Sequence, residues 1–446
     1  MTRFQLDNIS RWLLTATFLC LLLFTLSTPL YPVPLIGGRK FLTQLAFPLA
    51  VLSFFSLCVF YKRELRNFIS NFSRNFGLVV SPFLPFIAGL VLIFLIYLPE
   101  KEQFVFKPSS LVSYILFLSF IFAILRSSRQ RKLQKDWLWK VSSVSIWITL
   151  ILLCVISFEK GKSIFELREY IRPWVTVYSR CTALVSGICL FSIVYCNSKF
   201  EKVFYAVTGI VGFAIAAVIL QTRSVLLSPF IAFGLLIFYF LSKKKINLKS
   251  IAIIFSIFFI VCSLSFISLS QRVIKGTEEL ASSGNFSEIQ NVINKVEAAK
   301  PLSPSESQIL SSLNTSMGGR MAAWATAANV SKEHFLFGTG EGHLSHFIDV
   351  KKIFKSSGNF VIHFHSDFVQ VFVVGGVFLL LSLVLTQLFL LLQAIRRKNL
   401  IQLFLVTSMI TFGIGEISFI ETQTMLVFIS AWVASFLLLD CKTSQE

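Results

Sequence analysis

The sequence predicts an all-α polytopic membrane protein with about twelve transmembrane helices and one large helical loop. Hydrophobic residues make up 55% of the 446 residues, charged residues make up only 14%, and the mean hydropathy is +0.76. A water-soluble globular chain carries about 25% charged residues, so this chain has too little polar surface to cover a soluble body. The composition excludes a cytosolic enzyme, a disordered protein and a disulfide scaffold.

Long apolar runs are expected to cross the bilayer as helices. A spanning helix needs about 20 mostly apolar residues, whereas a spanning strand alternates apolar and polar residues, and these runs do not alternate. The predicted spans are Trp12–Leu30, Phe41–Tyr61, Phe76–Leu98, Leu111–Leu125, Val141–Phe158, Trp174–Cys196, Val203–Leu220, Val225–Leu241, Ser250–Ser270, Asp367–Ala394, Leu400–Ile420 and Met425–Leu439. The first run is expected to stay as a helix, because it is too long for a removable signal peptide and lacks a small-residue cleavage site.

The distribution of basic residues predicts the orientation of these spans. With the N-terminus inside, the short inner loops hold 19 Lys and Arg residues and the short outer loops hold 9. This asymmetry predicts that both termini are cytoplasmic. The net charge of +19 is then mainly a topology signal and a contact with anionic inner-membrane lipids, and not a nucleic-acid site.

One connection is far longer than the others. Gln271–His365 is a polar stretch of 95 residues, and a loop of that length is usually functional. Ser303-Pro304-Ser305-Glu306 has the pattern of a helix capping box. A second helix is expected over Arg320–Lys332, separated from the first by Gly318-Gly319. The predicted organisation is therefore nine spans in residues 1–270, a helical outer domain in 271–366, and three spans with a cytoplasmic tail in 367–446.

All five histidines lie in this late loop, at positions 334, 343, 346, 363 and 365. A metal site could combine His343-x-x-His346 with His363-x-His365. It is disfavoured because no cysteine and no well-placed carboxylate pair accompanies the histidines. We therefore expect no metal and no cofactor, and interpret His334, His343 and His346 as solvated loop residues.

His363 and His365 differ from the other histidines because they immediately precede the tenth span. Ser366 or Asp367 can cap the helix that follows. The positive end of that helix would then lie beside His365 and disfavour imidazolium, which leaves a neutral side chain that can act as a general base. The alternative is a histidine that only caps or anchors the helix at the membrane surface.

Three arginines on the predicted outer side are candidates for binding an anion. Arg223 lies in a very short turn, Arg180 about two turns into the sixth span, and Arg320 at the expected start of a helix. Guanidinium groups grip phosphate in bidentate fashion. The alternatives are that Arg223 snorkels to the interface and that Arg320 is a solvated helix-start residue.

Short motifs follow one another on the predicted outer side. They are Thr222-Arg223-Ser224 with Gly234, Gly319-Arg320 with Trp324 and Ala327, Phe337-Gly338-Thr339-Gly340, and His363-Phe364-His365-Ser366 with Gln370 and Gly375-Gly376. On these motifs, between Gln221 and Gly376, the chain resembles the bacterial O-antigen ligase and O-antigen polymerase superfamily. That superfamily has about twelve spans, a GT-C-like arrangement and one large late periplasmic loop. Ser366 stands where the family usually has asparagine.

The resemblance implies a glycosyltransferase of the bacterial inner membrane with a periplasmic active site. The donor would be a glycan on undecaprenyl diphosphate, transferred with inversion and without a metal. Arg223 and Arg320 would bind the diphosphate with help from Arg180. His365, or His363 in its place, would take the proton from the acceptor hydroxyl.

A ligase is the leading interpretation, because the His-x-His motif is joined directly to the tenth span; its acceptor would be a lipid A–core sugar. A polymerase, which joins lipid-linked repeats, is the alternative. A lipid-linked glycan flippase comes third, because transporters usually carry ionisable residues in mid-span, which are nearly absent here. A purely structural membrane partner would not need this set of arginines and histidines.

Overall fold

The computed structural model is all-helical wherever it describes the chain. The described residues are 65–97, 131–169, 175–242, 284–313, 316–340, 364–416 and 422–439, with the single residues 259, 263, 274, 278, 418 and 419. Within these stretches every regular element is a helix, and five helices are long and apolar enough to cross a membrane. The all-α class is thereby confirmed for this part of the chain. The full number of spans stays a prediction, because Trp12–Leu30, Phe41–Tyr61, Leu111–Leu125 and nearly all of Ser250–Ser270 lie outside the described residues.

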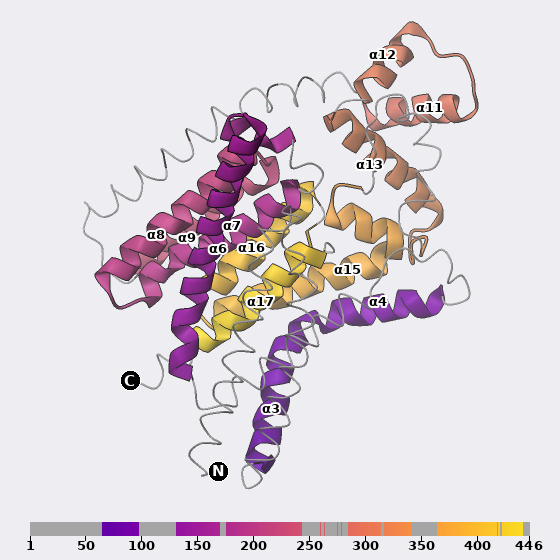
Figure 1. Cartoon of the computed structure of the whole chain (residues 1–446). Coiled ribbons are helices and arrows are strands. Elements are labelled where there is room, and N and C mark those ends of the chain that lie inside the picture. Colours follow the sequence, from indigo (N-terminus) through magenta and orange to yellow (C-terminus); the bar gives the residue numbers. More distant parts are fainter. Residues whose placement is uncertain are drawn as a thin grey trace.

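Helix α7 (Val175–Tyr195) is the buried centre of a bundle (Figure 1). In its most apolar window 89% of the residues are buried, against 39% in Trp139–Lys160. Small residues let the neighbours approach closely: a Cβ on Gly187 would lie 2.0 Å from the Phe404 ring. The surrounding helices are α6 (Arg131–Lys160), α8 (Lys199–Ala214), α9 (Leu227–Ser242), α16 (Leu400–Gly415) and α17 (Thr422–Leu439).

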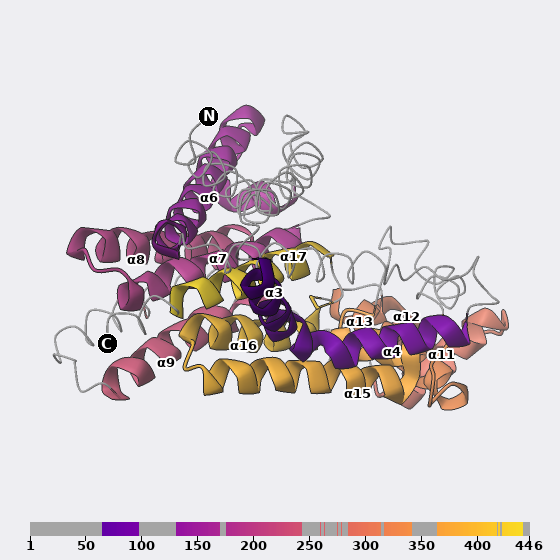
Figure 2. The same cartoon turned by 90° about the horizontal axis from the view of Figure 1, so that it is seen from below.

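A bent pair of helices packs beside the bundle. Helix α3 (Leu65–Val80) leads through the short turn η3 (Ser81–Phe83) into α4 (Leu84–Ile96), and the bend coincides with Pro82 in this turn and Pro85 in the first turn of α4 (Figure 1). Figure 2 shows α4 lying along α15 (Asp367–Arg396). The backbone N–H of Phe86, in the first turn of α4, donates to Thr386 Oγ1 at 3.1 Å. A donor that has no partner within its own helix is thus satisfied by α15.

Helix α15 consists of two helical pieces joined at a kink. Gly376 has φ 62° and ψ −161°, which no helical residue adopts. The 20 residues from Val377 to Arg396 rise about 30 Å at 1.5 Å per residue, which matches the hydrocarbon core of a bilayer. The first piece, from Asp367 to Gly375, therefore need not cross the membrane.

Three helices of the long loop predicted to lie on the outer side pack together at one end of α15 (Figure 1): α11 (Phe286–Glu297), α12 (Pro304–Leu313) and α13 (Ser316–Glu333). The expected capping box is confirmed. The Ser303 N–H donates to Glu306 Oε2 at 2.8 Å, and the Glu306 N–H donates to Ser303 Oγ at 3.3 Å.

The expected start of the second loop helix at Arg320 is wrong. Helix α13 begins at Ser316 and runs through Gly318-Gly319. The physical reason is close packing, because a Cβ on Gly318 would lie 2.1 Å from the carbonyl oxygen of Ser312. Arg320 accordingly lies in the second turn of α13, and it is not the helix-start cation that the sequence suggested.

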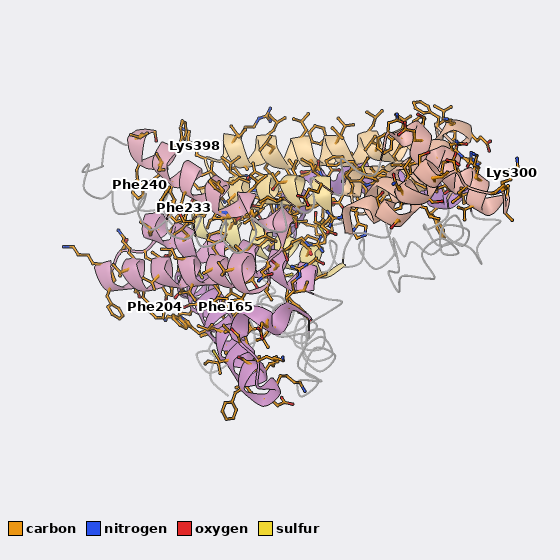
Figure 3. All side chains as sticks on the ribbon, turned by 90° about the horizontal axis from the view of Figure 1, so that it is seen from above. Phe165, Phe204, Phe233, Phe240, Lys300 and Lys398 are labelled. Carbon is orange, nitrogen blue, oxygen red and sulfur yellow. The ribbon has the colours of Figure 1, made fainter. Side chains whose placement is uncertain are left out.

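The orientation of the spans is a testable prediction. Lys398, in a predicted inner loop, and Lys300, in the predicted outer domain, lie at opposite ends of the structure (Figure 3). A reporter enzyme that works only outside the cytoplasm should be active when fused after Lys300 and inactive when fused after Lys398. A cytoplasmic reporter should show the reverse. Equal activity at both fusion points would contradict the predicted topology.

Candidate functional site

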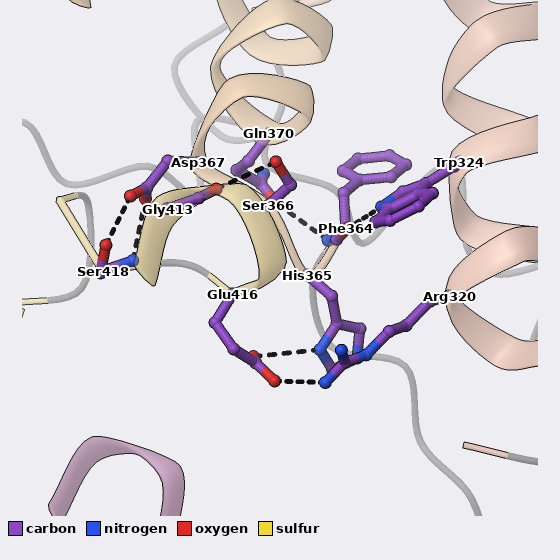
Figure 4. Close-up of polar contacts among 10 residues, drawn as sticks. All are labelled: Arg320, Trp324, Phe364, His365, Ser366, Asp367, Gln370, Gly413, Glu416 and Ser418. Atoms are coloured by element: carbon purple, nitrogen blue, oxygen red, sulfur yellow. Dashed lines mark hydrogen bonds and ion pairs between the residues drawn. The ribbon is translucent and has the colours of Figure 1, made fainter. Parts of the chain in front are cut away.

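A glutamate outside every sequence motif lies at the centre of the candidate site. Glu416 directly follows α16 in an extended conformation and is 5% exposed. Its Oε1 accepts a hydrogen bond from Arg320 Nη2, and its Oε2 lies 3.2 Å from His365 Nδ1 (Figure 4). The carboxylate thus joins the arginine of α13 to the histidine that precedes α15.

Opposing effects act on the charge of Glu416. Burial raises the pKa of this carboxyl, but the hydrogen bond from His365 and the charges of Arg320, His365 and Arg180 lower it, and the pKa falls well below its usual range. Glu416 is therefore ionised at neutral pH. Because an ionised carboxylate only accepts hydrogen bonds, His365 Nδ1 is the donor in this pair. Nε2 is then the nitrogen at which a neutral His365 takes up a proton.

The backbone around His365 is held in an unusual conformation. His365 has φ 50°, in the left-handed region that non-glycine residues seldom adopt. The backbone N–H and the backbone carbonyl of the preceding residue, the fully buried Phe364, are both hydrogen-bonded to side chains. Its N–H donates to Gln370 Oε1 at 3.2 Å, and its carbonyl accepts from Trp324 Nε1 at 2.7 Å (Figure 4). Because Trp324 and Arg320 are four residues apart on α13, one helix face holds both the His365 loop and Glu416.

The two residues expected to cap α15 do something else. Ser366 occupies the N-cap position, but its hydroxyl donates to the carbonyl of Gly413 at 3.1 Å and makes no capping bond. Asp367 is fully buried and accepts from Ser418 Oγ at 2.7 Å and from the backbone N–H groups of Ser418 and Phe419 at 2.9 and 2.8 Å. The expectation of side-chain capping is therefore wrong for Ser366. Together the two residues fasten the start of α15 to the chain on both sides of Glu416.

The other two candidate arginines come from the bundle. Arg180 lies in the second turn of α7, as expected, and is 1% exposed; its charge is one of those that lower the pKa of Glu416. Arg223 opens the short turn η7 (Arg223–Val225), whose backbone packs against α7 and α16. The side chain of Arg223 lies outside the described residues. The backbone therefore places Arg223 beside α7, which carries Arg180, and beside α16, which ends just before Glu416.

The order of these elements along the chain can be compared with known families. The model of the family described as O-antigen ligase matches residues 208–384. By this match, residues 208–384 form an O-antigen ligase domain, which covers less than half of the chain. Members of this family are membrane enzymes that transfer glycans, and they act on lipid-linked glycan substrates. No curated protein matches the chain.

The O-antigen ligase domain contains some of the site residues but not all of them. Arg223, Arg320 and His365 lie within it, whereas Arg180 precedes it and Glu416 follows it. His334 is exposed beyond the end of α13 and does not join the others. His343, His346 and His363 lie outside the described residues, so His363 stays a predicted alternative base.

Two residues near the site were missed by sequence reasoning. Glu416 had a signal: it is an acidic residue inside a run predicted to span the membrane, and such residues are functional candidates by default. Arg168 had no such signal, because it is one of several basic residues in a predicted outer loop. In the structure it lies in η5 (Ile164–Glu169), and its Nη1 donates to the carbonyls of Leu220, at 2.7 Å, and Gln221. Arg168 thus fixes the turn that leads into Arg223.

Proposed function

We propose that the chain is an O-antigen ligase that transfers a glycan from undecaprenyl diphosphate to a lipid A–core sugar. The observation that carries this proposal is the pairing of Glu416 with both His365 and Arg320. It combines a carboxylate–histidine pair, suited to removing a proton from a hydroxyl, with a guanidinium suited to a phosphate. The site would face the periplasm in a bacterial inner-membrane protein whose two termini are cytoplasmic.

In the proposed reaction His365 is the general base. Its Nε2 takes the proton of the acceptor hydroxyl while the acceptor oxygen attacks the anomeric carbon of the donor. The bond from that carbon to the diphosphate oxygen breaks on the opposite face, so the configuration inverts and the diphosphate leaves with the electron pair. Glu416 is a positioning residue: it holds the proton on Nδ1 and stabilises the imidazolium that forms. These steps move a proton and a glycosyl group between groups that the chain and its substrates supply, and none of them calls for a metal.

Charge develops on the leaving diphosphate, and arginines would stabilise it. Arg320 gives one N–H to Glu416, and a guanidinium carries five N–H donors in a planar fork. Glu416 can therefore aim Arg320 without using all of its donors. We assign diphosphate binding to Arg320 and Arg223, with Arg180 contributing charge from the buried end of α7.

Deletion of the gene followed by electrophoresis of lipopolysaccharide tests this function. Loss of all glycan-capped core, with restoration by the wild-type chain, is expected for a ligase. Core that carries a single repeat would instead identify a polymerase acting through the same residues. Accumulation of lipid-linked glycan that faces the cytoplasm would identify a flippase.

Arg223→Lys should impair the enzyme although the charge is kept. A lysine is a compact point charge that cannot present a bidentate fork to a diphosphate. Because the diphosphate is charged before and during transfer, both donor affinity and rate should fall. Donor binding and single-turnover transfer at matched expression measure the two effects. Full activity with lysine would mean that Arg223 only snorkels to the interface.

Trp324→Phe should lower kcat while leaving the KM for the donor nearly unchanged. The substitution keeps an aromatic ring but removes the N–H that holds the Phe364 carbonyl next to His365. One such hydrogen bond contributes about 1 kcal/mol, which corresponds to a loss of roughly fivefold in kcat. Trp432→Phe is the matched control, because the Trp432 indole N–H is buried in α17 without a hydrogen-bond partner among the described residues. An equal loss in both variants would point to general destabilisation.

A further inference from the structure

A short segment of the outer loop exposes three large apolar side chains. Phe335, Leu336 and Phe337 follow α13 after one intervening residue, His334, and are 55%, 53% and 37% exposed. The sequence places them in a polar outer domain, where such a cluster has no evident use. Isolated apolar residues on a surface are ordinary, but three in succession indicate a contact with an apolar partner.

The backbone of this segment is docked into the break of α15. The N–H groups of Val377 and Phe378 donate to the carbonyls of Phe335 and Leu336 at 2.9 and 3.3 Å. In the other direction, the N–H of Thr339 donates to the Val373 carbonyl at 2.8 Å. The segment therefore supplies hydrogen-bond partners to backbone groups of α15 on both sides of its kink. Non-helical backbone can lie at the depth of the hydrocarbon where it is packed against protein, as this backbone is against α15.

Glycines make this docking possible and fix its geometry. A Cβ on Gly376 would lie 2.3 Å from the backbone of Leu336, and a Cβ on Gly338 would lie 2.4 Å from the backbone of Gly375. Both glycines also have positive φ, at 62° and 68°. From the end of α4, the Tyr97 hydroxyl donates to the Gly338 carbonyl at 2.6 Å. The segment is thus clamped between α4 and α15.

The exposed side chains continue the apolar surface of the spanning part of α15. The rings of Phe337 and Phe378 stack with centroids 5.1 Å apart and an interplanar angle of 9°. Phe378 is 45% exposed, and further exposed apolar residues follow it towards Arg396 at Leu381, Val384, Leu385, Leu388 and Phe389. Because the part of α15 after Gly376 is about as long as the hydrocarbon core is thick, the Phe337–Phe378 stack marks its outer edge.

We propose that Phe335–Phe337 is seated in the bilayer, against phospholipid acyl chains at the outer end of the α15 span. The segment is then a short re-entrant stretch between the end of α13 and Gly338. This seat anchors the end of α13 at the membrane surface. It thereby sets the height of Arg320 relative to the plane in which a lipid-linked diphosphate lies, a consequence that rests on the proposed function.

Photo-crosslinking of the full-length chain in vesicles of phosphatidylethanolamine and phosphatidylglycerol tests the seat. A benzophenone amino acid is placed at Leu336, with the same label at Leu385 on α15 as the positive control and at Lys300 in the outer domain as the negative control. The expected result is a phospholipid adduct at Leu336 of similar yield to that at Leu385 and at least tenfold above Lys300. The same label at Phe335 should repeat the result if the Leu336 variant is poorly expressed.

Three results would overturn the proposal: a yield at Leu336 no higher than at Lys300, adducts only with a second copy of the chain, or adducts that form only when a polyprenyl diphosphate is added. The vesicles contain neither donor nor acceptor in the main experiment. A crosslinking result that contradicts the membrane contact of Phe335–Phe337 is therefore distinguishable from a wrong assignment of glycan transfer. The lipopolysaccharide phenotype tests that assignment separately.

Discussion

His365→Ala is expected to lower the rate of glycan transfer by about 10²–10⁴-fold, the usual effect of removing a general base. Donor binding should stay largely intact, because the diphosphate is assigned to the arginines and not to the histidine. The structural basis is the 3.2 Å approach of His365 Nδ1 to Glu416, which makes Nε2 the proton acceptor. Single-turnover transfer and donor affinity, measured on the same preparations, separate the two effects.

His334→Ala is the matched control for this experiment. His334 lies in the same loop, but its side chain is exposed beyond the end of α13 and joins none of the site contacts. Its loss should leave both rate and affinity unchanged. A normal rate in His365→Ala would move the base to His363 or away from this motif.

The apolar helices of the described residues were predictable because the length of an apolar run identifies them. The predicted run Trp174–Cys196 and the observed α7, Val175–Tyr195, differ by one residue at each end. The eleventh run was predicted to end at Ile420, but α16 ends at Gly415. The difference arises because averaging over an apolar run hides a single glutamate, whereas in the structure that glutamate ends the helix and turns to Arg320 and His365.

The contacts of the site could not be predicted, because they join distant parts of the chain. Arg320 and Glu416 are 96 residues apart, and no local spacing reports such a pair. The carboxylate that contacts His365 was not predicted either, because the sequence pattern around His365 reports only the helix that follows it.

The glycine motifs show the same limit of sequence reasoning. Gly318-Gly319 suggested a helix boundary, because glycine is unfavourable inside helices, but tertiary packing against α12 outweighs that preference. The pair at 375 and 376 does mark a break, since Gly376 leaves the helical region. Which pair breaks a helix is decided by the segment packed against it, and that information is absent from the local sequence.

Glu416→Gln is expected to reduce transfer by an amount that approaches the effect of losing His365. The amide keeps the size of the side chain but not its charge, and its NH₂ group can donate to His365 Nδ1 and favour the wrong tautomer. In serine proteases the corresponding carboxylate-to-amide change lowers kcat by about 10⁴-fold. Donor affinity should also fall, because Arg320 loses the charged partner that orients it. This fall should be smaller than the fall in rate, because Arg320 keeps its own charge.

The same substitution should also destabilise the fold. Removing one partner of a buried ion pair typically costs about 3–5 kcal/mol, because the other charge is left uncompensated; here Arg180 is 1% exposed and Arg320 only partly exposed. Thermal unfolding in detergent measures this loss. Glu333→Gln, an exposed position at the end of α13, is the control for the chemical change and should alter neither stability nor rate.

The effect of pH distinguishes loss of the charge from loss of packing. Because the pKa of Glu416 is lowered on folding, its contribution to stability is complete above the ordinary glutamate value of about 4.3 and is lost as the pH falls through the lowered pKa. The difference in unfolding free energy between wild type and Glu416→Gln should therefore be constant near neutral pH and should shrink on acidification. Glu416→Asp, which keeps the charge on a shorter side chain, should retain part of the rate and the same direction of pH dependence. A Glu416→Gln chain with wild-type rate and a pH-independent stability difference would remove Glu416 from the site.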